Sequence, residues 1–141
     1  MQFSADDLDN LCLCCWKEAR GEGQEGLRAV MHVILNRAKN WYKMSPDPIH
    51  SAVYGKNQFT SMSVPSDPEF NLEPKDGDPQ YTYCVGLAPD VLAETDPDPT
   101  NGALYYADLK YVTSGWFVRN IVQQPATHPQ TAVIGRHTFY S

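Results

Sequence analysis

Apolar side chains recur every three to four residues in the first third of the chain, the spacing of amphipathic helices. This pattern predicts a helix over residues 5–20 and a second over residues 24–41. Ser4 and Asp7 match a capping box before the first helix, and Gly21 is suited to end it. The inward positions of the two helices are Leu8, Leu11, Cys12, Cys15 and Ala19, then Leu27, Val30, Met31, Ile34, Ala38 and Trp41.

Proline, glycine and polar residues divide the middle of the chain into short segments. Asp47 is expected to cap a short helix that stops at Gly55. Residues 56–78 are rich in Asn, Ser, Pro, Asp and Gly and are predicted to form a loop. A further helix is expected from Pro79, and Pro89 is expected to kink it or divide it into two short pieces.

The last third has short β-prone runs at residues 103–106 and 136–140, with weaker candidates at residues 116–118 and 131–134. Helices followed by a small sheet indicate an α+β fold. The length fits one domain over residues 1–141.

The charge of the chain argues against several classes of partner. A formal net charge of −6 and a pI of about 5.0 make a nucleic-acid partner unexpected. No apolar run approaches the roughly 18 residues of a membrane span, so no membrane insertion is expected. The acidic N-terminus lacks the features of a signal peptide, so we expect synthesis in the cytoplasm without one. We also expect a monomer. An anionic substrate would have to be recognised by local contacts.

Three of the four cysteines, Cys12, Cys14 and Cys15, crowd into one segment, and Cys84 stands apart. Adjacent cysteines do not easily form a disulfide, and a helix holds Cys12 and Cys15 in poor geometry for one. The paired spacings of a zinc site are absent. Buried, reduced thiols are therefore predicted, with no metal and no cofactor.

Glu18 falls on the apolar side of the first predicted helix, seven residues after Leu11 and three after Cys15. An apolar wall disfavours the ionised form of a carboxyl group, which makes Glu18 a candidate general acid. The alternative is a carboxylate paired with Arg20, Arg37 or a backbone amide.

Glu22 follows the helix-ending Gly21 and precedes the second helix. A carboxylate at that position is stabilised by the helix dipole. The functional alternative is a second carboxylate that faces Glu18 across a cleft. Both interpretations stay open at this stage.

Aromatic side chains near the predicted strands are candidate carbohydrate contacts. Tyr105 and Tyr106 alternate along a strand, so one faces inward and one outward. With Trp116 they could stack on sugar faces and donate hydrogen bonds, or they could belong to the core. His137 could be a general base, a ligand or a structural residue.

Three further residues have a candidate role. Asn36 lies off the apolar stripe of the second helix and could brace a neighbouring loop. In the long loop, Gln58 is a candidate hydrogen-bonding group and Phe59 an apolar anchor.

The usual phosphate-loop, His-Glu-x-x-His and Gly-x-Ser-x-Gly motifs are absent from the sequence.

Five segments occur in one order along the chain. They are residues 16–22 (WKEARGE), 24–37 (QEGLRAVMHVILNR), 57–60 (NQFT), 98–106 (DPTNGALYY) and 135–139 (GRHTF). Together they resemble the motifs of the cell wall hydrolase family typified by the spore cortex-lytic enzymes of the SleB type. The chain departs from the family pattern at Pro89, at residues 62–67 and in its cysteine cluster.

The resemblance implies a small lysozyme-like fold related to lytic transglycosylases. It implies cleavage of the β-1,4 bond between N-acetylmuramic acid (MurNAc) and N-acetylglucosamine (GlcNAc) in peptidoglycan glycan strands. It assigns the acid to Glu18, with Glu22 as the candidate second carboxylate of a hydrolase. The candidate substrate-binding residues are Arg20, Asn36, Gln58, Phe59, Tyr105, Tyr106, Trp116 and His137.

Several functions remain open on the sequence. A catalytic chain without a signal peptide would suit a phage-type endolysin that acts on the wall after release. A rival is a non-catalytic module that keeps the groove and the aromatic side chains for binding glycan. A cysteine- or metal-dependent peptidase fits the sequence less well.

Overall fold

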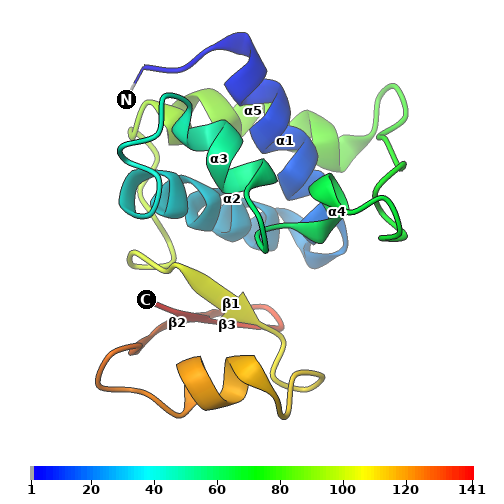
Figure 1. Cartoon of the computed structure of the whole chain (residues 1–141). Coiled ribbons are helices and arrows are strands. Elements are labelled where there is room, and N and C mark those ends of the chain that lie inside the picture. The colour runs from blue at the N-terminus through cyan, green and yellow to red at the C-terminus, as the bar shows by residue number, and fades with distance from the viewer. Residues whose placement is uncertain (1) are drawn as a thin grey trace.

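The computed structural model describes residues 2–141 and has two layers, one of helices and one built around a small sheet (Figure 1). This arrangement confirms the predicted α+β class. The helices are α1 Ala5–Ala19, α2 Gly23–Asn40, α3 Pro48–Tyr54, α4 Thr60–Ser63 and α5 Pro79–Leu92. The strands are β1 Tyr105–Ala107, β2 Gln130–Ile134 and β3 His137–Tyr140, and short helical turns occupy η1 Arg20–Glu22 and η2 Val118–Val122.

The start of α1 has the predicted capping box. The Ser4 hydroxyl accepts a hydrogen bond from the Asp7 amide at 3.1 Å, and the Asp7 carboxylate accepts one from the Ser4 amide at 2.9 Å. The side chain of Asp47 likewise caps α3, which begins at Pro48 as expected. The observed starts of these two helices agree with the predicted ones, because a helix cap depends only on residues within a single turn.

Helix α5 runs unbroken through Pro89, so the expected division into two pieces is wrong. Proline removes one backbone donor, but Pro89 lies near the end of the helix, where the Ala93 amide still bonds its carbonyl at 2.9 Å. The buried residues Cys84, Ala88 and Val91 face α1 and α2 across the core. Tertiary packing therefore outweighs the local cost of the proline.

The sheet is antiparallel, with the order β1-β3-β2. Residues 116–118, a weak strand candidate, instead begin the helical turn that continues into η2, so that expectation is wrong. The Asn120 side chain donates to the Trp116 carbonyl at 2.9 Å and the Arg119 amide to the Gly115 carbonyl at 3.1 Å. These bonds and burial of Ile121 favour a helix over the local β preference of the aromatic residues.

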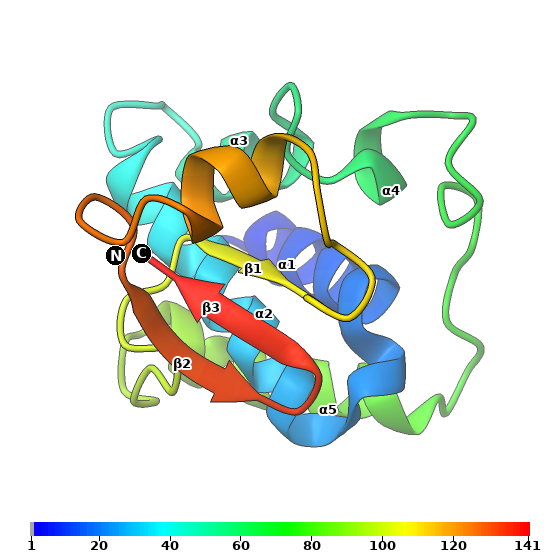
Figure 2. The same cartoon turned by 90° about the horizontal axis from the view of Figure 1, so that it is seen from below.

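Phe139 joins the sheet to the helical layer. Its side chain is completely buried among Ala29 and Val33 of α2 and Ala103. Tyr106 on β1 stacks on the Phe139 ring, with centroids 5.7 Å apart, and also packs against the main helical core. The side chain of Tyr106 therefore lies where the two layers meet. Figure 2 shows the strand β1, which carries Tyr106, from the side of the sheet layer.

All four cysteines are free and buried, which confirms the predicted reduced thiols. The Cys15 thiol donates to the Leu27 carbonyl at 3.0 Å. Burial raises the pKa of Cys12 to about 12 and raises that of Cys14 well above its ordinary value. A hydrogen bond with Cys84, and then burial, raise the pKa of Cys15. Thiols held protonated in the core are poor nucleophiles, which argues against a cysteine peptidase.

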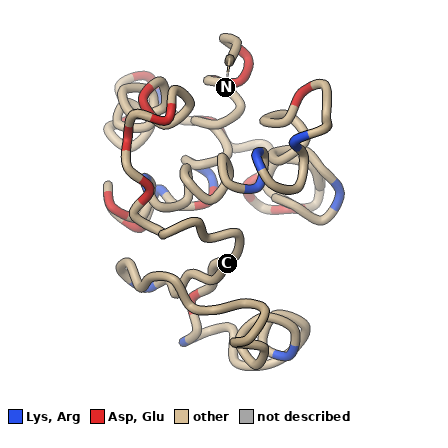
Figure 3. Tube along the Cα trace, turned by 90° about the vertical axis from the view of Figure 1, so that its left-hand side faces the viewer, with Lys and Arg blue, Asp and Glu red and all other residues tan. Residues whose placement is uncertain are grey.

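Charge is unevenly distributed between the two layers. We define the sheet layer as residues 103–141, which carry one acidic residue and three basic ones, a formal charge of +2. Residues 1–102 carry the other sixteen acidic and eight basic residues, a formal charge of −8. Figure 3 shows the acidic positions gathered on the helical side of the trace. Within residues 2–141, no helix has the length and apolar character needed to span a membrane.

Replacement of Gly26 by alanine is expected to destabilise the fold. A Cβ at Gly26 would stand 2.4 Å from the Glu22 Cβ, so the turn between α1 and α2 would have to shift. We expect a loss of about 1–3 kcal/mol in the free energy of unfolding, measured by urea denaturation. Gly86→Ala is the matched control, because its Cβ would meet nothing within 4 Å, and a gain of about 0.5–1 kcal/mol is expected. Equal effects of the two substitutions would contradict this account.

Candidate active site

Both carboxylate oxygens of Glu18 are hydrogen-bonded by side chains from other elements. Oε2 accepts a bond from the Ser61 hydroxyl at 2.8 Å, and Oε1 accepts one from the Tyr106 hydroxyl at 3.2 Å. Glu18 lies in the last turn of α1, Ser61 on α4 and Tyr106 on β1, so three segments far apart in the sequence meet at this carboxyl group. The general-acid role of Glu18 stays a prediction. The structure supplies its carboxyl group with two hydrogen-bond donors, Ser61 and Tyr106.

Tyr106 is held as a hydrogen-bond donor. Burial, and then the negative charge of Glu18, raise the pKa of Tyr106 well above its ordinary value. The phenol therefore keeps its proton and can donate it to the carboxylate in a hydrogen bond. The ring of His137 contacts the Tyr106 ring edge-on, with centroids 5.1 Å apart.

Lys17 fixes the segment that carries Ser61. Its ammonium group donates to the Ser61 carbonyl at 3.1 Å and to the Phe70 carbonyl at 2.8 Å, and the residue is only 8% exposed. Sequence reasoning missed both Lys17 and Ser61 as site residues. Lys17 follows Cys14 by three positions on the helix, so a charge beside the apolar stripe was the available signal. Ser61 gave none.

A pocket of about 330 Å³ is linked to this carboxyl group through Tyr106, which lines the pocket and donates to Glu18, whereas Glu18 itself is not part of the lining. The predicted contacts Gln58, Tyr105 and Trp116 lie together in its wall. The full lining is Arg37, Trp41, Asn57, Gln58, Tyr105, Tyr106, Trp116 and Phe117. Their role in substrate binding stays a prediction.

Arg37 is the charged residue of the pocket wall and was not among the predicted contacts. Its Nε donates to the Leu104 carbonyl at 2.7 Å and its Nη1 to the Gln58 side chain at 3.5 Å. The guanidinium lies 5.1 Å from the ring centroids of both Trp41 and Phe59. Phe59 is buried beneath it, as the anchor interpretation predicted. Burial lowers the pKa of Arg37, although the guanidinium remains cationic.

Arg20, predicted as a substrate contact, is engaged by other protein groups. Its guanidinium forms an ion pair with Glu69 and lies 4.4 Å from the Trp16 ring centroid. It is absent from the pocket lining described above. Its proposed contact with substrate stays untested, and its described contacts hold the end of α1 to the loop before α5.

Glu22 forms an ion pair with Arg136 at the turn between β2 and β3. The two Arg136 nitrogens Nη2 and Nε lie 2.5 and 3.3 Å from the Glu22 carboxylate oxygens. Its described partner thus lies on the sheet layer, whereas those of Glu18 are Ser61 and Tyr106. A role for Glu22 as second catalytic carboxylate stays a prediction.

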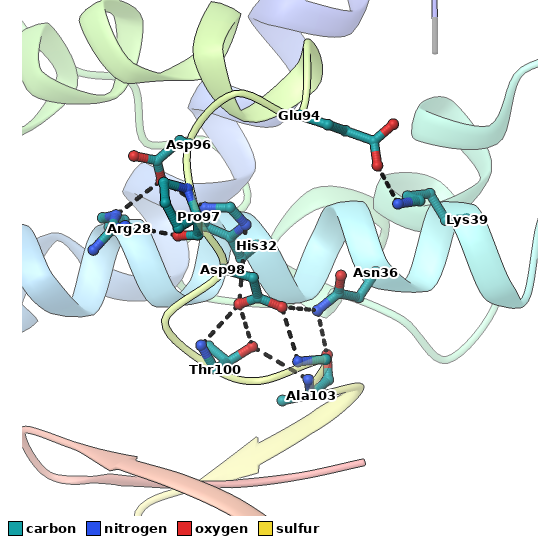
Figure 4. Close-up of polar contacts among 11 residues, drawn as sticks. Arg28, His32, Asn36, Lys39, Glu94, Asp96, Pro97, Asp98, Thr100 and Ala103 are labelled. Carbon is teal, nitrogen blue, oxygen red and sulfur yellow. Dashed lines mark hydrogen bonds and ion pairs between the residues drawn. The ribbon is translucent and has the colours of Figure 1, made fainter.

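Asn36 braces the loop that leads into β1, as one of the sequence interpretations expected (Figure 4). Its amide donates to the Asp98 carboxylate at 2.9 Å and to the Ala103 carbonyl at 3.0 Å. Asp98 also accepts from the Thr100 amide and hydroxyl at 2.8 and 2.7 Å and from the Gly102 amide at 2.9 Å. This network fixes the turn immediately before Tyr105 and Tyr106.

Asp98→Asn is expected to destabilise the protein at neutral pH, because an amide cannot accept from all of these donors. Burial alone would raise the pKa of Asp98, but hydrogen bonds from Asn36, Thr100 and Gly102 lower it below the ordinary value. Its contribution to stability is therefore complete above the ordinary pKa of about 3.9 and is lost as the pH falls through the lower folded-state pKa. We expect a loss of about 1–3 kcal/mol at pH 7 from chemical denaturation.

The difference between Asp98→Asn and the parent protein should shrink as the pH drops below about 4. Asp90→Asn, at an exposed position on α5, is the control and should change stability by less than about 0.5 kcal/mol. A difference independent of pH would show that the charge of Asp98 is not what holds the turn.

A metal centre is not evident at this site. Across the described part of the chain, no three His, Cys, Asp or Glu side chains are grouped so that they could hold a metal ion. The functional groups described at this site are the Glu18 carboxyl group and the hydroxyl groups of Ser61 and Tyr106.

The sequence profile of the family described as Cell Wall Hydrolase matches residues 21–140. The chain belongs to the cell wall hydrolase family. The match includes Glu22 but begins after Glu18, and the general-acid role of Glu18 stays a prediction.

Two relatives with similar sequences are spore cortex-lytic enzymes. That of Oceanobacillus iheyensis is 31% identical over 137 residues, which cover 97% of this chain and 42% of the relative. The enzyme of Halalkalibacterium halodurans is 30% identical over 138 residues, which cover 97% of this chain and 35% of the relative. The chain thus spans less than half the length of these relatives.

Two solved structures match nearly the whole chain. The catalytic domain of the germination-specific lytic transglycosylase SleB from Bacillus anthracis has a TM-score of 0.69 and 27% identity, covering 99% of this chain and 97% of that one. The catalytic domain of the Bacillus cereus SleB protein has a TM-score of 0.70 and 27% identity, with coverage of 99% and 93%. The fold expected from the family resemblance is confirmed.

Proposed function

We propose that this chain is the catalytic domain of a peptidoglycan lytic transglycosylase, which cleaves the MurNAc–GlcNAc β-1,4 bond. The observation that carries the proposal is the Glu18 carboxyl group, held by Ser61 and Tyr106 beside an aromatic-lined pocket. Membership of the cell wall hydrolase family and similarity to SleB catalytic domains support this substrate class.

In the proposed reaction, protonated Glu18 donates its proton to the glycosidic oxygen. The bond between that oxygen and C1 of MurNAc breaks, and the sugar develops oxocarbenium-like character. The Glu18 carboxylate then takes the proton of the MurNAc 6-hydroxyl as O6 bonds to C1. The products are a free GlcNAc 4-hydroxyl and a 1,6-anhydro-MurNAc end, and no water is consumed.

The partners of Glu18 suit a group that alternates between acid and base. Hydroxyl donors from Ser61 and Tyr106 stabilise the carboxylate that forms after the first proton transfer. Tyr106 keeps its own proton because its pKa is raised. The same carboxyl group then serves both steps, so a second carboxylate is not required.

Hydrolysis is the second candidate outcome and would need a positioned water or a second carboxylate, for which Glu22 is the candidate. The ion pair with Arg136 favours a structural role for Glu22 and makes transglycosylation the first choice. We also propose that residues 1–141 act as one domain and as a monomer. The phage-type endolysin interpretation remains a prediction.

The deciding experiment is digestion of purified peptidoglycan, followed by mass spectrometry of the soluble products. Anhydro-muropeptides, one water lighter than reducing muropeptides, are expected for a lytic transglycosylase. Reducing MurNAc ends would instead indicate a muramidase. Binding to the wall without release of soluble sugar would favour the non-catalytic glycan-binding module.

A further inference from the structure

Arg37 is a largely buried cation that forms no ion pair with a carboxylate of residues 2–141. Arg20, Arg28 and Arg136 each form an ion pair with a described carboxylate. Within residues 2–141, no carboxylate oxygen lies within 4.0 Å of the Arg37 guanidinium. The negative charge of Glu18 favours the cationic form of Arg37 without forming an ion pair with it. A buried charge that lacks an ion pair is costly, so a position of this kind is a candidate for binding an external anion.

The donors of Arg37 are only partly used by the protein. A guanidinium has five N–H donors, and the described bonds to Leu104 and Gln58 use two of them. The remaining three belong to a side chain that lines the pocket. Planar, forked donors of this kind match the geometry of a carboxylate.

The rest of the pocket wall is uncharged at neutral pH and suits a sugar. Trp41, Tyr105 and Trp116 supply aromatic faces, and Asn57 and Gln58 supply amides. The volume of about 330 Å³ falls within the range of roughly 300–1,000 Å³ of small-ligand sites. Aromatic faces with a few polar groups can hold a pyranose ring while Arg37 binds a charged substituent.

The pocket is also close to the proposed acid, because Tyr106 lines the pocket and donates to Glu18 at 3.2 Å. When Glu18 is protonated for catalysis, it offers no negative charge to balance Arg37. We propose that this pocket is a subsite for a sugar bearing a carboxylate, and that Arg37 binds that carboxylate and selects the substrate. This inference deepens the proposed function and rests on it for the identity of the polymer.

Two groups in peptidoglycan offer this chemistry. One is the lactyl carboxylate of a MurNAc residue whose stem peptide has been removed. The other is a carboxylate of the stem peptide itself. Arg37 would recognise either carboxylate through a direct contact. A chain with a formal net charge of −6 repels an anionic polymer at longer range, so it needs local contacts of this kind to bind one.

The test compares ligands that differ in charge, using the tryptophan fluorescence of the parent protein, in which two of the three tryptophans, Trp41 and Trp116, line the pocket. The probes are free MurNAc, its lactyl methylamide, the N-acetylmuramoyl dipeptide and the same dipeptide with its carboxylate amidated. We expect neutralisation of the recognised carboxylate to weaken binding by roughly 10- to 100-fold. A large loss of affinity between MurNAc and its methylamide identifies the lactyl carboxylate as the recognised group. A large loss between the dipeptide and its amide identifies the carboxylate of the stem peptide. Equal affinities within both pairs would overturn the inference.

These monosaccharide ligands contain no bond for the enzyme to cleave, so the binding result is independent of the proposed reaction. Cleavage of glycan strands with equal affinity within both pairs would overturn the inference and leave the proposed function standing. Charge-selective binding without cleavage of any strand would support the subsite and count against the proposed function.

Variants then assign the effect to Arg37. Arg37→Met should remove the preference for the charged ligand, and Arg37→Lys should keep part of it, since the charge remains and the fork is lost. Arg119→Met removes an exposed arginine of η2 that does not line the pocket, and it should keep the full preference. If folded Arg37→Met still prefers the charged ligand, Arg37 is not the residue that binds the carboxylate. If that variant does not fold, the comparison of ligands on the parent protein decides whether the pocket recognises a carboxylate.

Discussion

Glu18→Gln is expected to lower the rate of glycan cleavage by at least about 100-fold, the lower end of what a positioned general acid contributes. Glutamine has nearly the same shape and still offers an oxygen to Ser61 or Tyr106, but it has no proton to give to the glycosidic oxygen. The rate is measured as release of soluble muropeptides from purified peptidoglycan at fixed enzyme concentration.

Glu25→Gln is the matched control for this substitution. Glu25 is an exposed carboxylate in the first turn of α2, so its replacement should leave the cleavage rate within about twofold of the parent. Both variants should have the melting temperature of the parent within a few degrees. Cleavage by folded Glu18→Gln at the parental rate would remove Glu18 from the mechanism.

Phe139→Ala is expected to lower the free energy of unfolding by about 3–5 kcal/mol. The ring is completely buried and fills the space between β3, Ala103 and α2, so truncation leaves a cavity at the junction of the two layers. Tyr106 stacks on this ring and also holds Glu18, so activity should fall together with stability. Urea denaturation followed by circular dichroism measures the first effect.

Val133→Ala provides a comparison on the same sheet. Val133 is 62% exposed, and its truncation should change stability by less than about 0.5 kcal/mol. A similar small loss for Phe139→Ala would mean that the sheet is not anchored to α2 through this ring. The account of how Tyr106 is positioned would then be wrong.

Features set by neighbouring residues were predictable from the sequence. The capping box of Ser4 and Asp7, the cap at Asp47 and the apolar faces of α1 and α2 all depend on spacings within a few turns. The exception is Trp41, which was expected to face inward and is 39% exposed just after the end of α2. The same spacing placed Glu18 on the inner side of its helix, where the structure has it. The family motifs added the order of the remaining segments.

Contacts between distant segments were harder to predict. Nothing local indicated that Ser61 would reach Glu18 across 43 positions, or that Arg37 would form part of the pocket wall. The prediction of a strand at residues 116–118 was wrong. Their aromatic and β-branched side chains favour a strand locally, but the packing of Ile121 in the core favours a helix. Tertiary context supplies this information, and a single sequence does not display it.

The uneven charge of the two layers has a consequence for the encounter with an anionic polymer. At physiological salt, electrostatic forces are screened over about 8 Å, a distance shorter than the span of the protein. A glycan strand that approaches residues 103–141 therefore experiences mainly their +2 charge, not the total of −6. If the proposed substrate is right, this charge asymmetry favours approach of the polymer to the sheet layer, so an acidic isoelectric point is compatible with binding to an acidic wall.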